Sequence, residues 1–352
     1  MEWVRRRLRA LPPIARRDRQ IAELKANNLR DFKQLSAARA KNAALKARAR
    51  ERSVKVPSFR RNVYAERRMA ALMRDLNRTD RGTSVTNKLR SYSFARSWGV
   101  DVPEIHGIWD RIEDIVWDDL PDTIVIKSRM GSYARGVLPL KRVAGGWLVI
   151  TGDGGILTPT DIVARYRARR DDGTAAGPYI VEEFLGDVER DLMPIDVKFY
   201  AFYGEVAQLY LRSVAAHLEP NDGTYRVLDR DGQDLGPIYI ADHHDETIPI
   251  PKNLPDLVRV AELLSAAVPR AFIRIDLYEV DGRVVFGELT PRPGGRLTFP
   301  AEADARLGRF WEDAQVRLLN DAIDGVGYAL RFGPEPRELL VGGKPYLPPL
   351  PT

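Results

Sequence analysis

Two short apolar runs separated by a turn form the clearest pattern of hydrophobic and polar positions in this chain. Residues 272–278 read Phe-Ile-Arg-Ile-Asp-Leu-Tyr, and residues 286–291 read Phe-Gly-Glu-Leu-Thr-Pro. Residues 280–283, Val-Asp-Gly-Arg, are a turn signal, so the two runs predict a β-hairpin. Side chains two residues apart leave the same face of a strand, so we expect Arg274 and Asp276 to point the same way.

The carboxylates of Asp276 and Glu288 can face each other across this hairpin. Carboxylates are hard oxygen ligands, and Mg²⁺ takes one or two of them while its other positions hold water and substrate phosphates. The hairpin therefore predicts a metal site with the fixed cation of Arg274 beside it. The alternative is a pair of amphipathic strands whose charges face solvent.

A second predicted strand, residues 123–127, ends on a lysine and runs into a glycine-containing loop. The loop covers residues 128–137 and includes Gly131 and Gly136. Glycine lets the backbone approach a ligand closely, and successive amides can cradle phosphate oxygens while Lys127 adds a charge. The spacing is not that of a Walker A loop. An ordinary hairpin loop is the alternative.

Residues 178–186 predict another strand, which ends in Glu182 and Glu183. The backbone here suits an adenine pocket, because it can read the edge of the base while Val181, Phe184 and Leu185 hold its faces.

Residues 196–212 predict a hairpin that turns at Gly204. Lys198 and Arg212 are cations within its strands. Each is either solvated or turned inward toward an anion.

The N-terminal region differs in charge from the rest. The net charge is +6 overall, yet residues 1–68 hold 21 Lys and Arg against 6 Asp and Glu, a net of +15, which leaves −9 for the remainder. Residues 14–52 lack Pro and Gly and predict one long basic helix. Its apolar stripe consists of Ile21, Leu24, Phe32 and Leu35, and the polar residues that interrupt a coiled-coil heptad are Asn28, Asp31 and Asn42. The helix either attracts a polyanion such as RNA, an anionic lipid surface or an acidic polymer, or packs by its stripe on the main domain or a second copy.

Further helices are expected at 63–77 and 87–98. We expect five parts: a basic arm (1–68), an N-terminal subdomain (69–125), a small subdomain with the glycine loop (126–185), a C-terminal subdomain with the metal site (186–332), and a Pro- and Gly-rich tail (333–352). The tail is expected to be an extended strap or disordered.

Composition narrows the class of protein. At 44% hydrophobic residues the chain can bury a substantial core. It has no run of about 18 apolar residues and no secretory signal pattern, so we expect a cytoplasmic protein, with a position at the membrane periphery as the alternative. With no cysteine and four histidines, thiolate chemistry is excluded and a zinc site is not expected.

The order of these features resembles the ATP-grasp superfamily, in which two α+β subdomains grip ATP, over about residues 80–320. Four motifs resemble its TupA-like branch, which is linked with cell-surface polysaccharide and peptide assembly. They are Asp-Val-Lys-Phe at 196–199, Arg-Ile-Asp-Leu-Tyr at 274–278, Phe-Gly-Glu-Leu-Thr at 286–290 and Phe-Pro-Ala-Glu-Ala-Asp-Ala-Arg-Leu-Gly at 299–308. The expected fold class is therefore α+β, an ATP-grasp fold preceded by a long basic helix.

The resemblance implies roles for individual residues. Asp276 and Glu288 are implied as Mg²⁺ ligands, together with Thr290, which stands where many relatives place Asn. Arg274 and Lys198 are implied as catalytic cations. Either Asp187 or Glu189 is implied as the ribose ligand. The residues that we place at the ATP site are Lys88, Lys127, Gly131, Ser132, Tyr133, Ala134, Arg135, Gly136, Val137, Glu182, Glu183, Phe184, Leu185, Lys198 and Arg212.

These roles predict an ATP- and Mg²⁺-dependent carboxylate–amine ligase that works through an acylphosphate. The expected partners are ATP and two substrates, a carboxylate and an amine, each either a small molecule or part of a polymer. We also expect residues 1–55 to bind an anionic polymer or a membrane surface. A homodimer is a further expectation. No specific nucleic-acid motif is present. One alternative is a kinase of the same fold that phosphorylates a hydroxyl, such as that of a sugar. Another is a non-catalytic polyanion-binding protein that uses the basic arm.

Overall fold

A computed structural model describes most of the chain. The described residues are 12–53, 56–76, 78, 87–130, 136–150, 155–190, 192–214, 223–238, 243–293 and 298–348. The chain divides into two compact units, Met1–Val56 and Pro57–Thr352.

The first unit contains one long helix, α2 (Pro12–Ser53), which confirms the helix predicted at 14–52. Proline is tolerated at its start because the first helical N–H groups have no partner within the helix. Every side chain from Arg16 to Lys46 is exposed, including Leu24 and Phe32 of the predicted stripe. Among the described helices, none is both long and apolar enough to cross a membrane.

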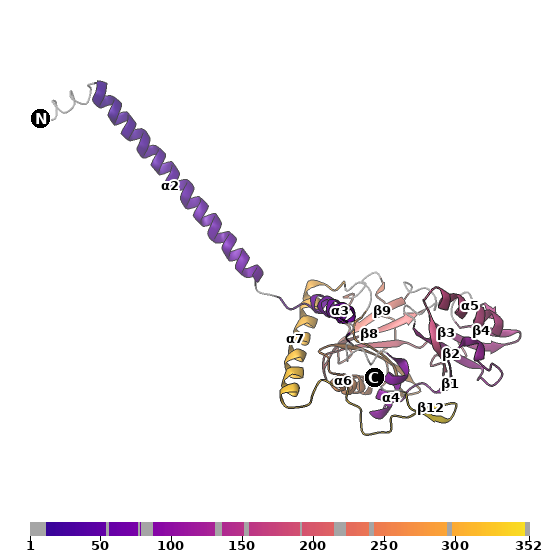
Figure 1. Ribbon diagram of the computed structural model, residues 1–352. Coiled ribbons are helices and arrows are strands. Elements are labelled where there is room, and N and C mark those ends of the chain that lie inside the picture. The colour runs from indigo at the N-terminus through magenta and orange to yellow at the C-terminus, as the bar shows by residue number, and fades with distance from the viewer. Residues whose placement is uncertain are drawn as a thin grey trace. The chain divides into compact units, whose positions relative to one another are not determined.

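The second unit contains a sheet of eight strands in the order β13-β12-β1-β6-β2-β3-β4-β5. Helix α5 (Pro159–Asp171) covers it through the buried residues Ile162 and Tyr166. Figure 1 shows α5 with β2, β3 and β4 at one end of this unit. The strands are β1 (Ile105–Trp109), β2 (Thr123–Met130), β3 (Val137–Val143), β4 (Gly146–Val149), β5 (Ile156–Leu157), β6 (Ala176–Glu182), β12 (Leu339–Val341) and β13 (Lys344–Tyr346).

Part of the predicted tail belongs to this sheet. Strands β12 and β13 form a hairpin, and β12 pairs in parallel with β1 through Ile105 and Val341. The expectation of an extended strap or disorder is therefore wrong for residues 339–346. Leu339 is buried in the main core, which holds the hairpin in place.

A second sheet has five antiparallel strands in the order β11-β10-β7-β8-β9. The predicted hairpin of residues 272–291 is confirmed as β10 and β11, and its turn places Asp281 and Gly282 at φ 50° and 78°. The hairpin predicted at 196–212 is confirmed as β7 and β8. The strands are β7 (Asp196–Ala201), β8 (Val206–Val214), β9 (Gly223–Leu228), β10 (Ile273–Val280) and β11 (Arg283–Thr290).

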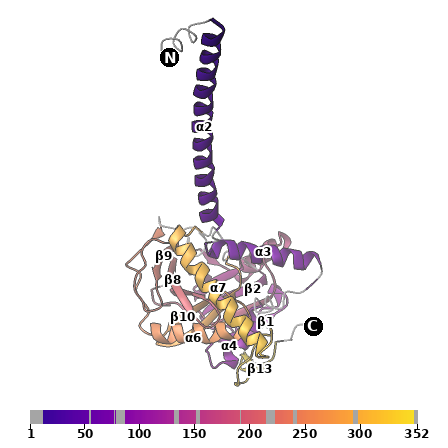
Figure 2. The same ribbon diagram turned by 90° about the vertical axis from the view of Figure 1, so that its left-hand side faces the viewer.

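The two faces of the five-stranded sheet are covered by different helices. Helix α6 (Leu254–Ala267) packs on the face that carries Val197 and Phe199. Helices α3 (Phe59–Asp75) and α7 (Ala301–Ile323) pack on the opposite face, which carries Tyr200 and Phe202. Figure 2 shows α7 running across this side of the unit with α3 beside it.

Helix α3 begins at Phe59, earlier than the predicted residue 63, because Ser58 caps it by accepting a hydrogen bond from the backbone N–H of Arg61 at 3.1 Å. Phe59 is fully buried in an aromatic cluster with partners such as Phe272 and Trp311. A Cβ at Gly308 of α7 would lie 2.3 Å from the backbone N of Ser58, so this close approach needs glycine. Helix α3 is thus part of the second unit.

The second unit contains two further helical elements. Helix α4 (Lys88–Ser97) matches the helix predicted at 87–98, and Asn87 caps it by accepting from the backbone N–H of Arg90 at 3.2 Å. A short 3-10 helix, η2 (Ile112–Asp114), contributes Ile112 to the core beneath the eight-stranded sheet.

Candidate active site

The candidate site lies on the face of the five-stranded sheet opposite α6. Because side chains alternate along a strand, Lys198 leaves β7 on the face away from Val197 and Phe199. The same alternation on β10 places Asp276 on this face. The strand register sets Asp276 beside Lys198 on one side and beside Glu288 on the other, so the three side chains form one row.

The predicted metal ligands converge on a single nitrogen atom. Arg274 Nη2 lies 2.8 Å from Asp276 Oδ2, 2.8 Å from Glu288 Oε1 and 2.9 Å from Thr290 Oγ1. Arg274 Nε also donates to Asp276 Oδ1 at 2.6 Å. The Thr290 hydroxyl donates to Glu288 Oε1 at 3.1 Å. Oxygen atoms of three side chains thus surround one positively charged atom, Arg274 Nη2.

Glycine in the second motif makes this convergence possible. The register of the hairpin shifts between Asp276 and Leu277, which leaves Gly287 in a bulge. A Cβ there would lie 2.8 Å from Tyr278 Cε2 and 3.0 Å from the carbonyl oxygen of Asp276. The bulge keeps Glu288 directly opposite Asp276.

Lys198 is a buried cation held by two carboxylates. Its Nζ lies 2.5 Å from Asp276 Oδ2 and 3.1 Å from Asp196 Oδ2. Burial lowers the pKa of Lys198, but Asp196 and Asp276 outweigh burial and hold this pKa above its ordinary value. Burial raises the pKa of Asp276, and the cations of Arg274 and Lys198 oppose that rise.

A second cation cluster involves the eight-stranded sheet and α4. Lys127 of β2 forms an ion pair with the buried Glu182, and Tyr92 donates to Glu182 Oε2 at 2.9 Å. Burial lowers the pKa of Lys127, but Glu182 and Tyr92 outweigh it and raise this pKa. Burial and the charge of Lys127 lower the pKa of Lys88, while Glu288 and Glu182 act in the opposite direction.

Lys88 interacts electrostatically with Lys127 of the second cluster and with Glu288 of the first, and the ring centroids of Tyr92 on α4 and Phe286 on β11 are 6.0 Å apart, so the two clusters are neighbours. Among the described residues, no hydrogen bond or ion pair holds the Lys88 ammonium. Two lysines that repel each other beside a carboxylate pair favour an anionic ligand between them.

The remaining predicted residues are placed less centrally. Arg212 lies on β8, two strands from Asp276, with Nη1 3.8 Å from Asp196 Oδ2. Phe184 is buried against Val125 and Ile150. Leu185 is half-buried, and the carboxylate of Glu183 accepts from the backbone N–H of Glu104 at 3.2 Å.

The predicted glycine loop is described at both ends, and its residues 128–130 belong to strand β2 instead of to a loop. Gly131, Ser132, Tyr133, Ala134 and Arg135 lie outside the described residues. Gly136 accepts from the backbone N–H of Ser128 at 2.8 Å, and Val137 begins β3.

Both ribose alternatives, Asp187 and Glu189, are exposed. Asp187 caps the turn that follows it, accepting at 3.0 Å from the backbone N–H groups of Glu189 and Arg190.

Sequence reasoning missed two residues of the site. Tyr92 lies four residues after Lys88, so helical spacing could have placed both on one face of α4. Asp196 lies two residues before Lys198, so strand alternation could have placed it beside that lysine.

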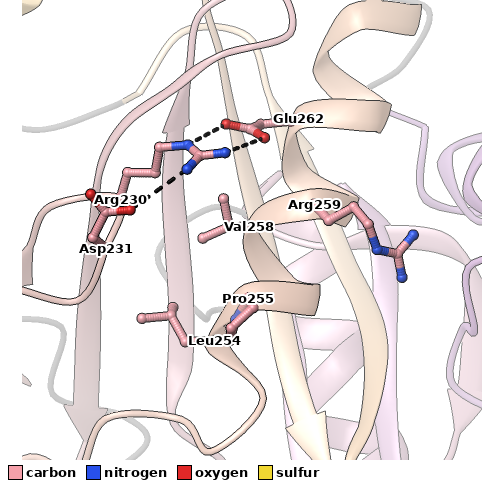
Figure 3. Close-up of a pocket in the computed structure, with 7 residues that line it drawn as sticks. All are labelled: Arg230, Asp231, Leu254, Pro255, Val258, Arg259 and Glu262. Carbon is pink, nitrogen blue, oxygen red and sulfur yellow. Dashed lines mark hydrogen bonds and ion pairs between the residues drawn. The ribbon is translucent and has the colours of Figure 1, made fainter.

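A separate pocket of ≈ 350 Å³ lies between α6 and the turn after β9. Figure 3 shows Arg230 pointing across it to Glu262, with Leu254 and Val258 beside them. Arg230 Nε and Nη2 donate to the two Glu262 oxygens at 2.8 and 3.0 Å. No predicted site residue lines this pocket. Helix α6, which forms part of it, covers the face of the five-stranded sheet that is opposite to the face carrying Lys198.

The residues of the hairpin suit Mg²⁺. Within the described part of the chain, no group of three or more His, Cys, Asp or Glu is arranged to hold a metal ion. Mg²⁺ needs only one or two protein carboxylates when phosphates and water supply its other ligands. The oxygens of Asp276, Glu288 and Thr290 already converge on a cationic atom, so the donor set fits this metal.

The two sheets, the lysines and the carboxylate hairpin agree with the arrangement expected of the ATP-grasp class. Residues 67–311 match the family described as TupA-like ATPgrasp, and the chain belongs to that family. The resemblance inferred from the four motifs and the predicted ATP-grasp fold are therefore confirmed.

Similar solved structures also belong to the ATP-grasp class. A D-alanine–D-alanine ligase from Bacillus anthracis complexed with ATP is 13% identical, with 72% of this chain and 76% of that chain covered and a TM-score of 0.43. The ATP-grasp ligase PsnB complexed with a minimal precursor is 15% identical, with 74% and 73% covered and a TM-score of 0.38. No curated protein sequence matches.

Proposed function

We propose that this protein is an ATP- and Mg²⁺-dependent carboxylate–amine ligase that forms an amide through an acylphosphate. The observation that supports the proposal is the convergence of Asp276, Glu288 and Thr290 oxygens beside three lysines, Lys88, Lys127 and Lys198. Such a site can neutralise a triphosphate and position it. The described residues that form it include no serine or histidine that could act as a nucleophile or general base.

A carboxylate does not condense with an amine unaided, because it is a poor electrophile. In the proposed reaction a carboxylate oxygen attacks the γ-phosphorus of ATP, ADP leaves, and an acylphosphate forms. The amine nitrogen then attacks the carbonyl carbon, phosphate leaves, and a proton passes from the amine to solvent. Positioning and charge neutralisation supply most of the catalysis in such transfers.

In the proposed reaction, different residues of the site have different roles. Lys127 and Lys198 bind phosphate oxygens with ammonium groups that their carboxylate partners hold in place. Arg274 neutralises the transferring phosphoryl group and then the tetrahedral intermediate. Asp276, Glu288 and Thr290 hold Mg²⁺, which when bound offsets the negative charge of the phosphate oxygens.

The substrates belong to the same proposal. An amine and a carboxylate, one of them part of a cell-surface polymer or a peptide, would fit the family to which the chain belongs. Product analysis with amino acids and uronic acids as acceptors tests this. A ligase releases free phosphate only when both substrates are present, a kinase leaves phosphate on a hydroxyl, and a binding protein produces no ADP.

The Glu288→Gln variant is the control for that assay, because it removes a charge from the proposed metal pair at a half-exposed position. Phosphate release that persists unchanged in this variant would contradict the role proposed for Glu288 as a metal ligand. Phosphate found on an acceptor hydroxyl would replace the ligase proposal with the kinase alternative.

A further inference from the structure

The outer face of α3 is unusually apolar for a solvent-exposed helix surface. Its exposed side chains include Tyr64, Met69 and Leu72, with exposed fractions of 50%, 61% and 48%, and Leu76 at the C-cap is 68% exposed. Residues 69, 72 and 76 follow i, i+3, i+7 spacing, so they form one stripe along the helix.

Arginines lie beside this stripe. By helical spacing the exposed Arg61 and Arg68 lie next to it, with the exposed Asp75 near them, whereas the exposed Arg60 and Arg74 leave other sides of the helix. Two further charged residues of α3 contact the body of the protein. Glu66 pairs with Arg270, and Arg67 donates to the carbonyl of Pro293.

We propose that this face, residues 60–76, docks the protein on the surface of an anionic lipid bilayer. A helix with arginines beside an apolar stripe matches the chemistry of the bilayer interface. The apolar side chains enter the headgroup boundary while the cations meet anionic headgroups. A soluble polyanion would use the arginines alone and leave Met69, Leu72 and Leu76 in water.

The inner face of α3 makes such docking favourable. Phe59 and Val63 are buried in the aromatic cluster, and Ser58 both caps the helix and donates to Asp304 Oδ2 at 2.6 Å. The helix is therefore formed before any bilayer is met. Binding does not have to repay the cost of ordering it, as an unfolded amphipathic segment must.

Helix α7 offers a matched control on the same side of the unit. Its exposed residues Val316, Leu319 and Ile323 also follow i, i+3, i+7 spacing, with exposed fractions of 58%, 54% and 73%. Their exposed charged neighbours include Glu312 and Asp313. An anionic surface repels these, so the α7 stripe should stay in water when α3 docks.

The experiment uses the full chain with a single label. Because the protein has no cysteine, Leu72→Cys and Leu319→Cys each give one site for an environment-sensitive fluorophore. With vesicles of phosphatidylcholine and phosphatidylglycerol, we expect the label at 72 to shift to the blue and to resist an aqueous quencher. The label at 319 should do neither. A label on α3 reports on this face even if α2 also binds vesicles.

A charge variant measures the electrostatic part. In the Leu72→Cys background, Arg68→Gln should weaken vesicle binding about fivefold, since each basic residue near an anionic surface contributes about 1 kcal/mol. Rising salt concentration should also weaken the binding of the parent protein to anionic vesicles.

Several results would overturn the inference. One is an equal response of the label at 72 to vesicles of phosphatidylcholine alone, or a response to poly-L-glutamate in place of vesicles. Another is protection that grows with protein concentration without lipid, because a second copy would then cover the face. If the emission of the label at residue 72 does not shift with anionic vesicles, the inference is wrong. None of these outcomes depends on the reaction that the protein catalyses.

Discussion

Replacing Asp276 with asparagine should destabilise the fold far more than replacing Glu288 with glutamine, although each change removes one negative charge from the proposed metal pair. Asp276 is 1% exposed and accepts from Arg274 and Lys198. The Glu288 side chain is 49% exposed. Neutralising Asp276 removes the negative charge that balances two largely buried cations, Arg274 and Lys198. Neutralising Glu288 has a smaller effect, because water reaches the groups around its half-exposed side chain.

The magnitude follows from that difference in burial. Removing one partner of a buried ion pair typically costs about 3–5 kcal/mol, because the remaining charge is left uncompensated. An exposed pair contributes about 0–1 kcal/mol. With a urea dependence of about 3 kcal/mol per molar for a chain of this size, Asp276→Asn should lower the unfolding midpoint by about 1–1.7 M. Glu288→Gln should lower it by about 0.3 M or less.

The assay is equilibrium urea unfolding followed by circular dichroism, with ADP production measured on the same samples below the transition. Both variants should lose Mg²⁺-ATP turnover, and only Asp276→Asn should lose stability. Lys198→Met combined with Asp276→Asn should cost less than the sum of the two single changes, since the second removes a charge that the first leaves unpaired.

Two results would refute this reasoning. Equal midpoints for Asp276→Asn and Glu288→Gln would show that the Asp276 carboxylate does not compensate the buried cations. Wild-type ADP production in both folded variants would show that the hairpin does not hold the metal.

Four further variants test other parts of the structure. Lys127→Met and Lys198→Met should each weaken ATP binding more than about tenfold, a loss of about 1.4 kcal/mol or more, and unchanged affinity by calorimetry in both would contradict the proposed ATP site. Phe59→Ala should destabilise the second unit by about 3–5 kcal/mol, and a urea midpoint equal to that of the wild type would show that α3 is not anchored there. Deleting residues 1–55 should leave ATP binding intact while lowering affinity for an acidic polymer or anionic vesicles in a salt-dependent way, and insolubility of the shortened chain would indicate a structural role instead.

The hairpin site was predictable because strand chemistry is local. Arg274 and Asp276 share a face through period-2 alternation, and the turn at residues 280–283 brings Glu288 opposite Asp276. The same rule could have added Asp196 to the prediction for Lys198. The basic helix was predictable for an equally local reason, since residues 14–52 contain no helix breaker.

Features that depend on distant residues were not predictable in this way. The ion pair between Lys127 and Glu182 requires β2 and β6 to be neighbours, which no local pattern states. The start of α3 was placed too late because its arginines look like a continuation of the basic arm, whereas Phe59 is anchored by aromatic residues far along the chain.

The parallel pairing of β12 with β1 has a consequence for how the chain is made. Ile105 leaves the ribosome long before Val341, so one edge of β1 has no neighbour while most of the protein is being synthesised. An open strand edge is a template for pairing with another chain. Nascent or prematurely stopped chains that lack Leu339–Val341 are therefore the species most exposed to edge-to-edge aggregation. The last short hairpin of the sheet protects the yield of folded protein as well as its stability.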